Sequence, residues 1–228
     1  MKAYIIIPTY NEAKNIGPLI AEILEASPGI QVVVVDEKSS DGTAPLARMM
    51  QAQHPDYVQV LHSHMLRDAY VAGFRLALAQ GATHVLTMDA DFTHPPAALP
   101  NLLAADADLV IASRYLRGSR IRRWGWWTRF RAGRLNSFAR KHLSLSPKDC
   151  LSSFRCYRRE ALERVSFDEL RSDGAAFQVE LLAKIAASGP VAEVPVSFDA
   201  RKQDASKWNA RMVREARRAI AQLSCRPI

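Results

Sequence analysis

The stretch Val85-Leu86-Thr87-Met88-Asp89-Ala90-Asp91-Phe92-Thr93-His94-Pro95-Pro96 joins an apolar run to two carboxylates and then to a proline pair. Because proline stops sheet pairing, this pattern is typical of a buried strand that delivers acidic side chains to its carboxyl end. Alternate residues of an extended segment share a face, so Asp89 and Asp91 can reach one divalent cation. Carboxylate oxygens suit magnesium or manganese, and a bound diphosphate would supply the remaining charge partner. The alternative is a solvated Asp-Ala-Asp turn that caps the next helix.

Strands and helices alternate before this stretch. Apolar runs, mostly β-branched in the first two, predict strands at residues 3–7, 31–35, 58–61 and 85–88. Helical spacing predicts helices from about residue 13 to the Pro28-Gly29 stop, from 43 to 53 and from 68 to 80. The alternation predicts an α/β fold with a mainly parallel sheet flanked by helices. Because ligands bind at the carboxyl ends of such strands, the polar clusters at residues 8–12, 36–41 and 89–93 are expected to converge there.

The composition indicates one substantial core, with 228 residues, 48% of them hydrophobic and 24% charged. We expect one domain over residues 1–200 and a basic amphipathic helix within 201–228. No window approaches the roughly 20 apolar residues of a membrane span, so membrane contact would be peripheral. The net charge of +8 favours anionic partners such as nucleotides, lipid phosphates, an acidic membrane surface or nucleic acid. Three cysteines without CxxC spacing argue against a zinc site or disulfide framework and favour a reducing cytoplasm.

Three motifs are similar to those of a known family: Pro8-Thr9-Tyr10-Asn11-Glu12, Asp36 with Ser39-Ser40-Asp41-Gly42-Thr43, and Asp89-Ala90-Asp91 with His94-Pro95-Pro96. Later blocks follow in the same order, at residues 112–115, 149–155, 177–180, 193–196 and 206–207. Nearly the whole chain resembles family-two glycosyltransferases, particularly the dolichol-phosphate mannosyltransferase branch. The resemblance implies an A-type glycosyltransferase (nucleotide-diphospho-sugar transferase) fold. It also implies inverting transfer of a hexose, from GDP-mannose or alternatively UDP-glucose, to a polyprenyl phosphate.

The resemblance also implies roles for single residues. The nucleotide-sugar donor would contact Pro8, Tyr10, Glu12, Asp36, Asp41, Arg67 and Ala90. Mg²⁺ or Mn²⁺ would bind Asp89 and Asp91, with Thr93 a candidate further oxygen ligand, and would neutralise the leaving diphosphate. Two donor residues have structural alternatives, since Glu12 could serve a helix macrodipole and Asp41 a turn and cap.

A phosphate acceptor explains why no general base is evident. Its oxygen is already anionic near neutral pH, so the reaction needs positioning and charge stabilisation instead. Arginine can clamp phosphate through two hydrogen bonds. The candidates are Arg114, Arg129, Arg131 and Arg134. Of these, Arg114 and Arg129 are the catalytic candidates, in addition to Asp89 and Asp91 of the metal pair. Arg155, Arg201 and Lys207 are further candidate site residues. A solvated basic face is the alternative for each arginine.

Two basic segments point to a membrane surface. Residues 117–142 contain eight arginines, one lysine, no acidic residue and three of the four tryptophans. Tryptophan beside arginine favours a bilayer interface, where a polyprenyl phosphate would also be presented, so we expect a cytoplasmic protein peripheral to the inner face of the cell membrane. A core-packed aromatic loop is the alternative, and no nucleic-acid recognition module is visible. Residues 207–223 read as an amphipathic helix that lies on the membrane or docks on the domain.

Departures from the family pattern leave other functions open. Glu37 stands in place of a second aspartate, Met65-Leu66-Arg67-Asp68-Ala69 replaces a glycine-rich loop, and Ser153 replaces glycine. A transferase with a hydroxyl acceptor would need a base, for which Glu180 or Asp149 is the first candidate. A degenerate protein that only binds nucleotide or scaffolds a membrane is the non-enzymatic alternative.

Overall fold

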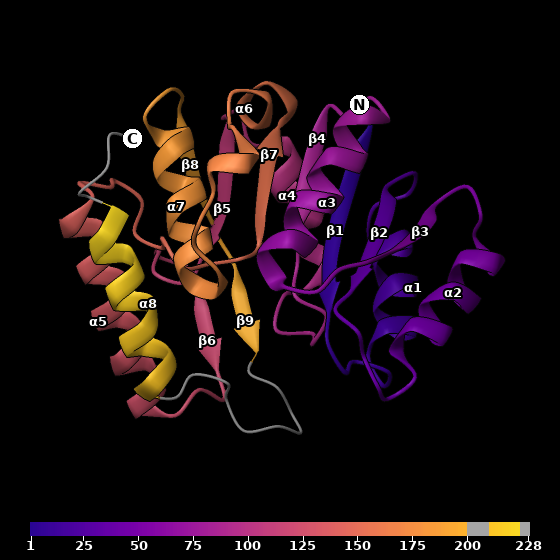
Figure 1. Ribbon diagram of the computed structural model, residues 1–228, viewed down its shortest axis with the longest axis horizontal. Helices are drawn as coiled ribbons and strands as arrows, with labels where there is room; N and C mark the ends of the chain where they lie inside the picture. Colours follow the sequence, from indigo (N-terminus) through magenta and orange to yellow (C-terminus); the bar gives the residue numbers. More distant parts are fainter. Residues whose placement is uncertain (200–209, 224–228) are drawn as a thin grey trace.

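The computed structural model describes residues 1–199 and 210–223, which form a mixed α/β fold (Figure 1). Within them, a seven-stranded sheet has the order β3-β2-β1-β4-β7-β5-β8. Its strands are β1 (Ala3–Thr9), β2 (Gln31–Asp36), β3 (Val58–His62), β4 (His84–Thr87), β5 (Leu109–Ser113), β7 (Arg155–Arg158) and β8 (Val191–Pro195). All pairs are parallel except those of β7, which is antiparallel to β4 and β5. The predicted α/β fold with a mainly parallel sheet is confirmed.

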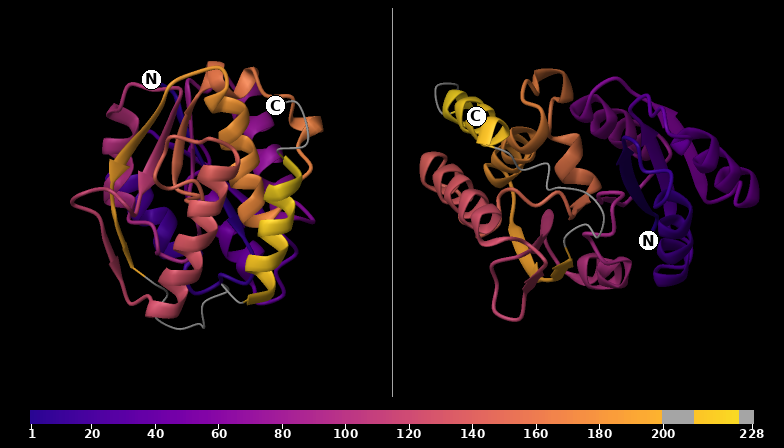
Figure 2. Two further views of the ribbon diagram at one scale, coloured as in Figure 1. Left: turned by 90° about the vertical axis from the view of Figure 1, so that its left-hand side faces the viewer. Right: turned by 90° about the horizontal axis from the view of Figure 1, so that it is seen from below.

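Helices cover both faces of this sheet (Figure 2). They are α1 (Ile16–Ala26), α2 (Thr43–Gln53), α3 (Leu66–Ala79), α4 (Leu99–Ala104), α5 (Trp126–His142), α6 (Arg159–Glu163), α7 (Gly174–Ala186) and α8 (Ala210–Leu223), with short 3₁₀ turns at Pro96–Ala98 and Phe167–Glu169. A second, two-stranded parallel sheet pairs β6 (Arg120–Arg122) with β9 (Ser197–Asp199). The four predicted strands and three predicted helices are present. However, α1 begins at Ile16 rather than near residue 13, because a turn closed on the Glu12 carbonyl precedes it.

The alternation of side chains along β1 divides the core in two. Tyr4 and Ile6 pack on the face covered by α3 and α7, whereas Ile5 and Ile7 pack on the face covered by α1 and α4. Successive residues of a strand point to opposite faces, so a continuous apolar run is needed where both faces are buried. This explains why the sequence of β1 shows no polar alternation.

The approach of α3 to β1 depends on Gly73. A β-carbon at this position would lie 2.4 Å from Cγ2 of Ile6, closer than atoms can pack. Glycine removes the conflict because it has no side chain. The position of α3 matters for the site, since its first two turns carry Leu66 and Tyr70 into the cavity described below.

The C-terminal helix α8 docks on α5 and α7 (Figure 1). Ile220 and Leu223 are buried, and the guanidinium of Arg217 lies 4.8 Å from the ring centroid of Phe138 on α5. Of the two alternatives for this helix, the structure shows docking; residues 207–209 of the predicted helix lie outside the described residues. In the described part of the chain, no helix combines the length and apolar character that crossing a membrane requires.

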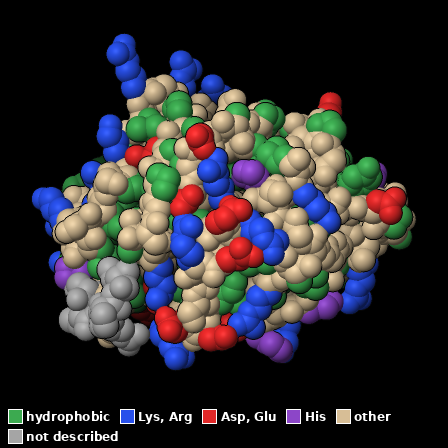
Figure 3. Space-filling model, turned by 90° about the horizontal axis from the view of Figure 1, so that it is seen from above, with side chains coloured by type: hydrophobic (Ala, Val, Ile, Leu, Met, Phe, Trp, Pro, Cys, Tyr) green, Lys and Arg blue, Asp and Glu red, His purple; other side chains and the backbone are tan. Residues whose placement is uncertain are grey.

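Basic and acidic side chains are interspersed on the end of the molecule where the parallel strands begin (Figure 3). Arg158 pairs there with Asp106, and Arg164 pairs with Asp108. Neighbouring charges of opposite sign largely cancel at a distance, so this end is not a strong attractor of anions. The excess of basic residues in segment 117–142 lies elsewhere, on β6 and α5.

Candidate active site

A cavity of about 480 Å³ lies at the carboxyl ends of the parallel strands. Its lining from β1, β2 and the segments after them includes Pro8, Tyr10, Glu12 and Glu37. The segment after β4 contributes Asp89, Ala90, Asp91, Thr93 and His94. Of the three polar clusters expected to meet, the first and third therefore line one cavity, and the second contributes Glu37.

Two predicted donor residues, Asp36 and Asp41, brace the wall rather than line it. The buried carboxylate of Asp36 accepts hydrogen bonds from the Thr9 hydroxyl (3.1 Å) and the Ser39 backbone N–H (3.0 Å). Asp41 accepts from the Thr43 hydroxyl (2.6 Å) and the Ala13 N–H (3.0 Å). Slight burial raises the pKa of Asp41, but these hydrogen bonds outweigh it and lower that pKa. Asp41 thus makes the turn contacts of its structural alternative, while the N-cap of α2 is Gly42, without a side-chain cap hydrogen bond.

The carboxylates of Asp89 and Asp91 are each held by a neighbouring hydroxyl. The Ser153 hydroxyl donates to Asp89 Oδ1 (2.9 Å), and the Thr93 hydroxyl donates to Asp91 Oδ1 (2.6 Å). The Ser153 contact is a hydrogen bond that a glycine, the residue expected here from the resemblance, could not make. Two carboxylates beside room for a diphosphate match the oxygen ligands that Mg²⁺ or Mn²⁺ takes, so the residues present fit such a cation.

His94 helps to orient Asp89 through its backbone and side chain. Its Nδ1 accepts a hydrogen bond from the Asp89 backbone N–H (3.0 Å), and its Nε2 lies 3.8 Å from Asp89 Oδ2. The imidazole is buried, stacked on Phe154 and edge-on to Phe198. Burial lowers the pKa of His94, and because Nδ1 accepts the Asp89 N–H, the neutral ring carries its proton on Nε2. The motif His94-Pro95-Pro96 marked this histidine in the sequence, but nothing there assigned it a role.

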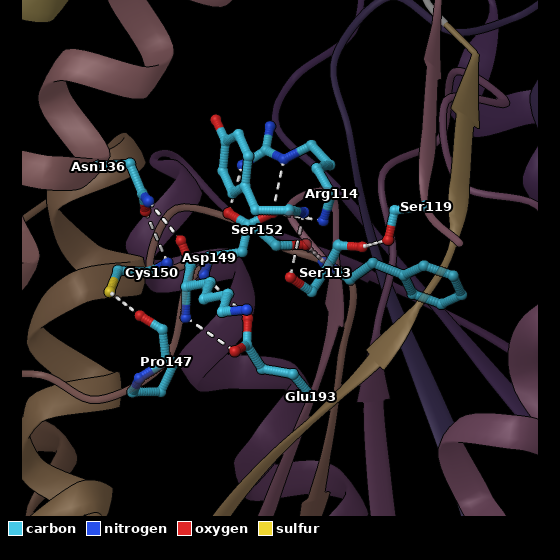
Figure 4. Close-up of polar contacts among 12 residues, drawn as sticks. Ser113, Arg114, Ser119, Asn136, Pro147, Asp149, Cys150, Ser152 and Glu193 are labelled. Atoms are coloured by element: carbon cyan, nitrogen blue, oxygen red, sulfur yellow. Dashed lines mark hydrogen bonds and ion pairs between the residues drawn. The ribbon is translucent and has the colours of Figure 1, made fainter. Parts of the chain in front are cut away.

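Arg114 lies in the cavity wall and is paired with a buried acid (Figure 4). Its Nε and Nη2 donate to the two oxygens of Asp149, both at 2.7 Å, and its backbone N–H donates to the same carboxylate at 3.0 Å. Burial alone would raise the pKa of Asp149, but Arg114 outweighs it and lowers that pKa. The guanidinium also lies 5.3 Å from the Trp124 ring centroid and 5.7 Å from that of Phe198. Arg114 is therefore a fixed cation at the cavity.

The other three predicted acceptor arginines lie on α5, outside the residues that line the cavity. Arg129, Arg131 and Arg134 are exposed; Arg129 donates to the Ile121 carbonyl, and Arg134 lies over the Phe130 ring. Arg123 instead lines the cavity, half exposed, with its Nε 3.7 Å from Asp199 Oδ1. The sequence marked Arg123 only as one of many arginines in a basic segment.

A hydrogen-bond network fixes the segment that carries Asp149 (Figure 4). Glu193 on β8 accepts from the backbone N–H groups of Lys148 (2.8 Å) and Asp149 (2.9 Å). Asn136 on α5 donates to the Lys148 carbonyl and accepts from the Cys150 N–H. The backbone N–H groups of Lys148, Asp149 and Cys150 thereby all have partners, which favours a single conformation.

Arg155 and Arg67 are further predicted residues outside the cavity lining. The fully buried guanidinium of Arg155 donates to the carbonyls of Ser152, Gln178 and Cys150 at 2.7–2.8 Å, and so ties the loop before β7 to α7. Arg67 pairs with Asp68. Arg201 and Lys207 lie outside the described residues.

The two candidate bases of a hydroxyl acceptor do not line the cavity. Asp149 is bound by Arg114, and the buried Glu180 accepts from the N–H groups of Arg171 and Ser172. Their carboxylates hold local structure, and the geometry gives neither access to a substrate hydroxyl.

Residues 4–166 match the family model described as Glycosyl transferase family 2. The chain belongs to this family. It is 36% identical to polyprenol monophosphomannose synthase from Mycolicibacterium smegmatis, over 99% of this chain and 88% of that protein. It is also 36% identical to undecaprenyl-phosphate mannosyltransferase from Micrococcus luteus, over 95% of this chain and 91% of that protein. The predicted family is confirmed, and this family 2 member is a glycosyltransferase.

Solved structures agree on the fold of this family 2 glycosyltransferase. Glucosyl-3-phosphoglycerate synthase from Mycobacterium tuberculosis, crystallised with Mn²⁺, UDP and phosphoglyceric acid, matches with a TM-score of 0.71 and 20% identity. The match covers 100% of this chain and 80% of that one. At this identity the likeness concerns the fold alone, and it confirms the predicted A-type glycosyltransferase fold.

Proposed function

We propose that this glycosyltransferase moves mannose from GDP-mannose to a polyprenyl phosphate, with inversion at the anomeric carbon and with Mg²⁺ or Mn²⁺. The observation that carries the proposal is the similarity, over at least 95% of the chain, to two proteins named for polyprenyl-linked mannose transfer. The cavity supports it chemically, because a pair of oriented carboxylates faces the same space as an arginine.

In this proposal the donor binds across the ends of β1 and β2. Pro8, Tyr10 and Glu12 line the nucleotide pocket and Ala90 lies beside the diphosphate, while Asp36 and Asp41 support the wall beneath. Asp89 and Asp91 would hold the divalent cation, which would supply positive charge to the leaving diphosphate. Ser153 and His94 keep Asp89 in place, and Thr93 does so for Asp91, so less reorganisation is needed when the donor arrives.

The acceptor phosphate attacks without a general base, because its oxygen is anionic near neutral pH. Arg114 and Arg123 offer positive charge at the cavity, where positioning and charge stabilisation are the main needs. Nε of Arg123 and Oδ1 of Asp199 are 3.7 Å apart, too far for a hydrogen bond, so an incoming phosphate can compete for that guanidinium.

The surface of α5 supports peripheral docking on the inner face of the cell membrane. Trp126, Trp127 and Phe130 are 65%, 54% and 52% exposed, and the two indoles stack on each other. Arg129, Arg131 and Arg134 extend from the same helix. Exposed indoles sit well at headgroup depth, and guanidinium groups meet lipid phosphates there. Segment 117–142 is part of the proposed catalytic domain, which extends over residues 1–200, and would present the acceptor to the rest of it. The proposed basic helix within 201–228 would lie beside this domain.

The test combines purified protein, Mn²⁺, a polyprenyl phosphate and labelled nucleotide sugars, including GDP-mannose and UDP-glucose. Label extracted into the organic phase measures transfer to lipid. We expect metal-dependent organic label from GDP-mannose above the other donors. Organic label from UDP-glucose alone would contradict the proposed donor. Label only in water-soluble products would contradict the proposed acceptor, and no product with the folded protein would favour a degenerate enzyme.

A further inference from the structure

Two polar side chains line the cavity from its helical wall without a hydrogen-bond partner among the described residues. Tyr70 lies on α3 and Gln178 on α7, and their exposed fractions are only 1% and 3%. In that part of the chain, the buried Oε1 of Gln178 has no partner, and no hydrogen bond to the Tyr70 hydroxyl is found. Buried polar groups ordinarily have partners, so the Gln178 amide oxygen points to a ligand that supplies one, and the Tyr70 hydroxyl lines the same cavity.

The ring of Tyr70 and the backbone of Gln178 are both held in place. The ring of Tyr70 stacks on Phe177 with centroids 5.4 Å apart and planes 8° apart, and also on Phe74. Gly73 allows α3 to sit close against the sheet. On α7, the backbone carbonyl of Gln178 accepts from the buried Arg155. Groups fixed before a ligand arrives lose little conformational freedom on binding.

Tyr70 lies close enough to Asp89 to feel its charge, and Gln178 lines the same cavity. Burial raises the pKa of the Tyr70 hydroxyl well above its ordinary value, and the nearby charge of Asp89 raises it further, so the hydroxyl keeps its proton. Gly174 and Ala175, at the start of α7, also line this wall and take little space there. In a nucleotide-diphosphate sugar the hexose is attached directly to the diphosphate, so it must lie beside Asp89.

The chemistry of the pair favours a sugar over a phosphate. A phenol and a carboxamide are uncharged, and each can both donate and accept a hydrogen bond. Hexose hydroxyls need this combination, whereas a phosphate is better served by the cations that line the same cavity, Arg114 and Arg123. We propose that Tyr70 and Gln178 form a subsite that binds hydroxyl groups of the transferred hexose and so selects the donor sugar. The inference rests on the proposed function, since it takes a nucleotide-diphosphate hexose as the donor.

Calorimetric binding of GDP-mannose and of GDP, both with Mn²⁺, tests this subsite. Tyr70→Phe removes only the hydroxyl and keeps the stacked ring, and Gln178→Met keeps the length of the side chain without its amide. Each variant should bind GDP-mannose about threefold to tenfold more weakly, the equivalent of one neutral hydrogen bond, and GDP with unchanged affinity. The matched control is Tyr4→Phe, a buried tyrosine whose hydroxyl donates to Gln80 and which does not line the cavity. It should change neither affinity.

Analogues of GDP-mannose that each lack one sugar hydroxyl identify the contact. The effect of Tyr70→Phe should vanish for the analogue that lacks its hydroxyl partner. Unchanged GDP-mannose affinity in both variants would overturn the subsite, as would equal weakening of GDP and GDP-mannose, which indicates a structural role. If the wild type transfers sugar only from UDP-glucose, the proposed donor is wrong, and the same comparison with UDP-glucose and UDP still decides the subsite.

Discussion

The buried pair of Arg114 and Asp149 should make Asp149→Asn one of the most destabilising conservative changes in the chain. The Asp149 side chain is 0% exposed and that of Arg114 only 7%, and three hydrogen bonds join the two residues. Asparagine keeps the shape but removes the charge and turns an amide N–H₂ toward a guanidinium. Removing one partner of a buried ion pair costs about 3–5 kcal/mol, because the other charge stays buried and uncompensated.

Urea unfolding followed by circular dichroism measures this cost, with Asp106→Asn as control. Asp106 also pairs with an arginine, Arg158, but is 88% exposed, so its loss should cost no more than about 1 kcal/mol. Arg114→Met combined with Asp149→Leu should recover much of the stability, since an apolar pair leaves no buried charge. Equal losses in Asp149→Asn and Asp106→Asn would refute the reasoning.

The same pair sets a pH dependence. Because the pKa of Asp149 is below its ordinary value of 3.8 in the folded protein, its stabilisation is complete above 3.8. It is lost as the pH falls through the lower, folded value. Asp149→Asn should therefore flatten the fall in unfolding free energy in this acidic range. An unchanged acid profile would show that other groups dominate it.

Three further predictions concern the metal pair, the membrane and the fold. Asp91→Asn should weaken Mn²⁺-dependent GDP-mannose binding about 100-fold in calorimetry, because the cation loses a charged ligand; unchanged binding would exclude Asp91 as a ligand. Trp126→Ala with Trp127→Ala should reduce co-sedimentation with anionic vesicles by about tenfold or more, since both exposed indoles are lost, and full retention would contradict the interfacial role of α5. Gly73→Ala should lower unfolding free energy by about 1–3 kcal/mol through its clash with Ile6, and a neutral result would show that α3 can shift.

Local patterns explain why much of the fold could be predicted. The apolar runs of β1 and β2 are long enough to require burial on both faces, and the polar clusters after them mark the carboxyl edge of a parallel sheet. The antiparallel strand β7 was not predicted. It has only four residues, and two of them, Arg155 and Arg158, are charged. From sequence alone, a charged strand residue is expected to be exposed. Arg155 is instead buried, because three backbone carbonyls accept its hydrogen bonds.

The candidate site was predictable where chemistry and chain position coincide. Asp89 and Asp91 follow β4 within four residues, so their place at the carboxyl edge of the sheet follows from chain position, although Asp91 lies in a turn rather than on an extended strand. The pairing of Arg114 with Asp149 joins residues far apart in sequence, and both Tyr70 and Gln178 reach the cavity from separate helices. Those contacts depend on how α3, α7 and β5 pack, which periodicity does not specify.

The most direct measurement of the central claim compares two acceptors of one chain length, a polyprenyl phosphate and the corresponding polyprenol, in the GDP-mannose reaction with Mn²⁺. The phosphate should receive labelled mannose, the alcohol should receive none, and a chelator should stop the reaction. Because inversion is proposed, nuclear magnetic resonance of the product should show a β-mannosyl phosphate from the α-linked donor. Transfer to the polyprenol at a comparable rate, or an α-linked product, would contradict the account.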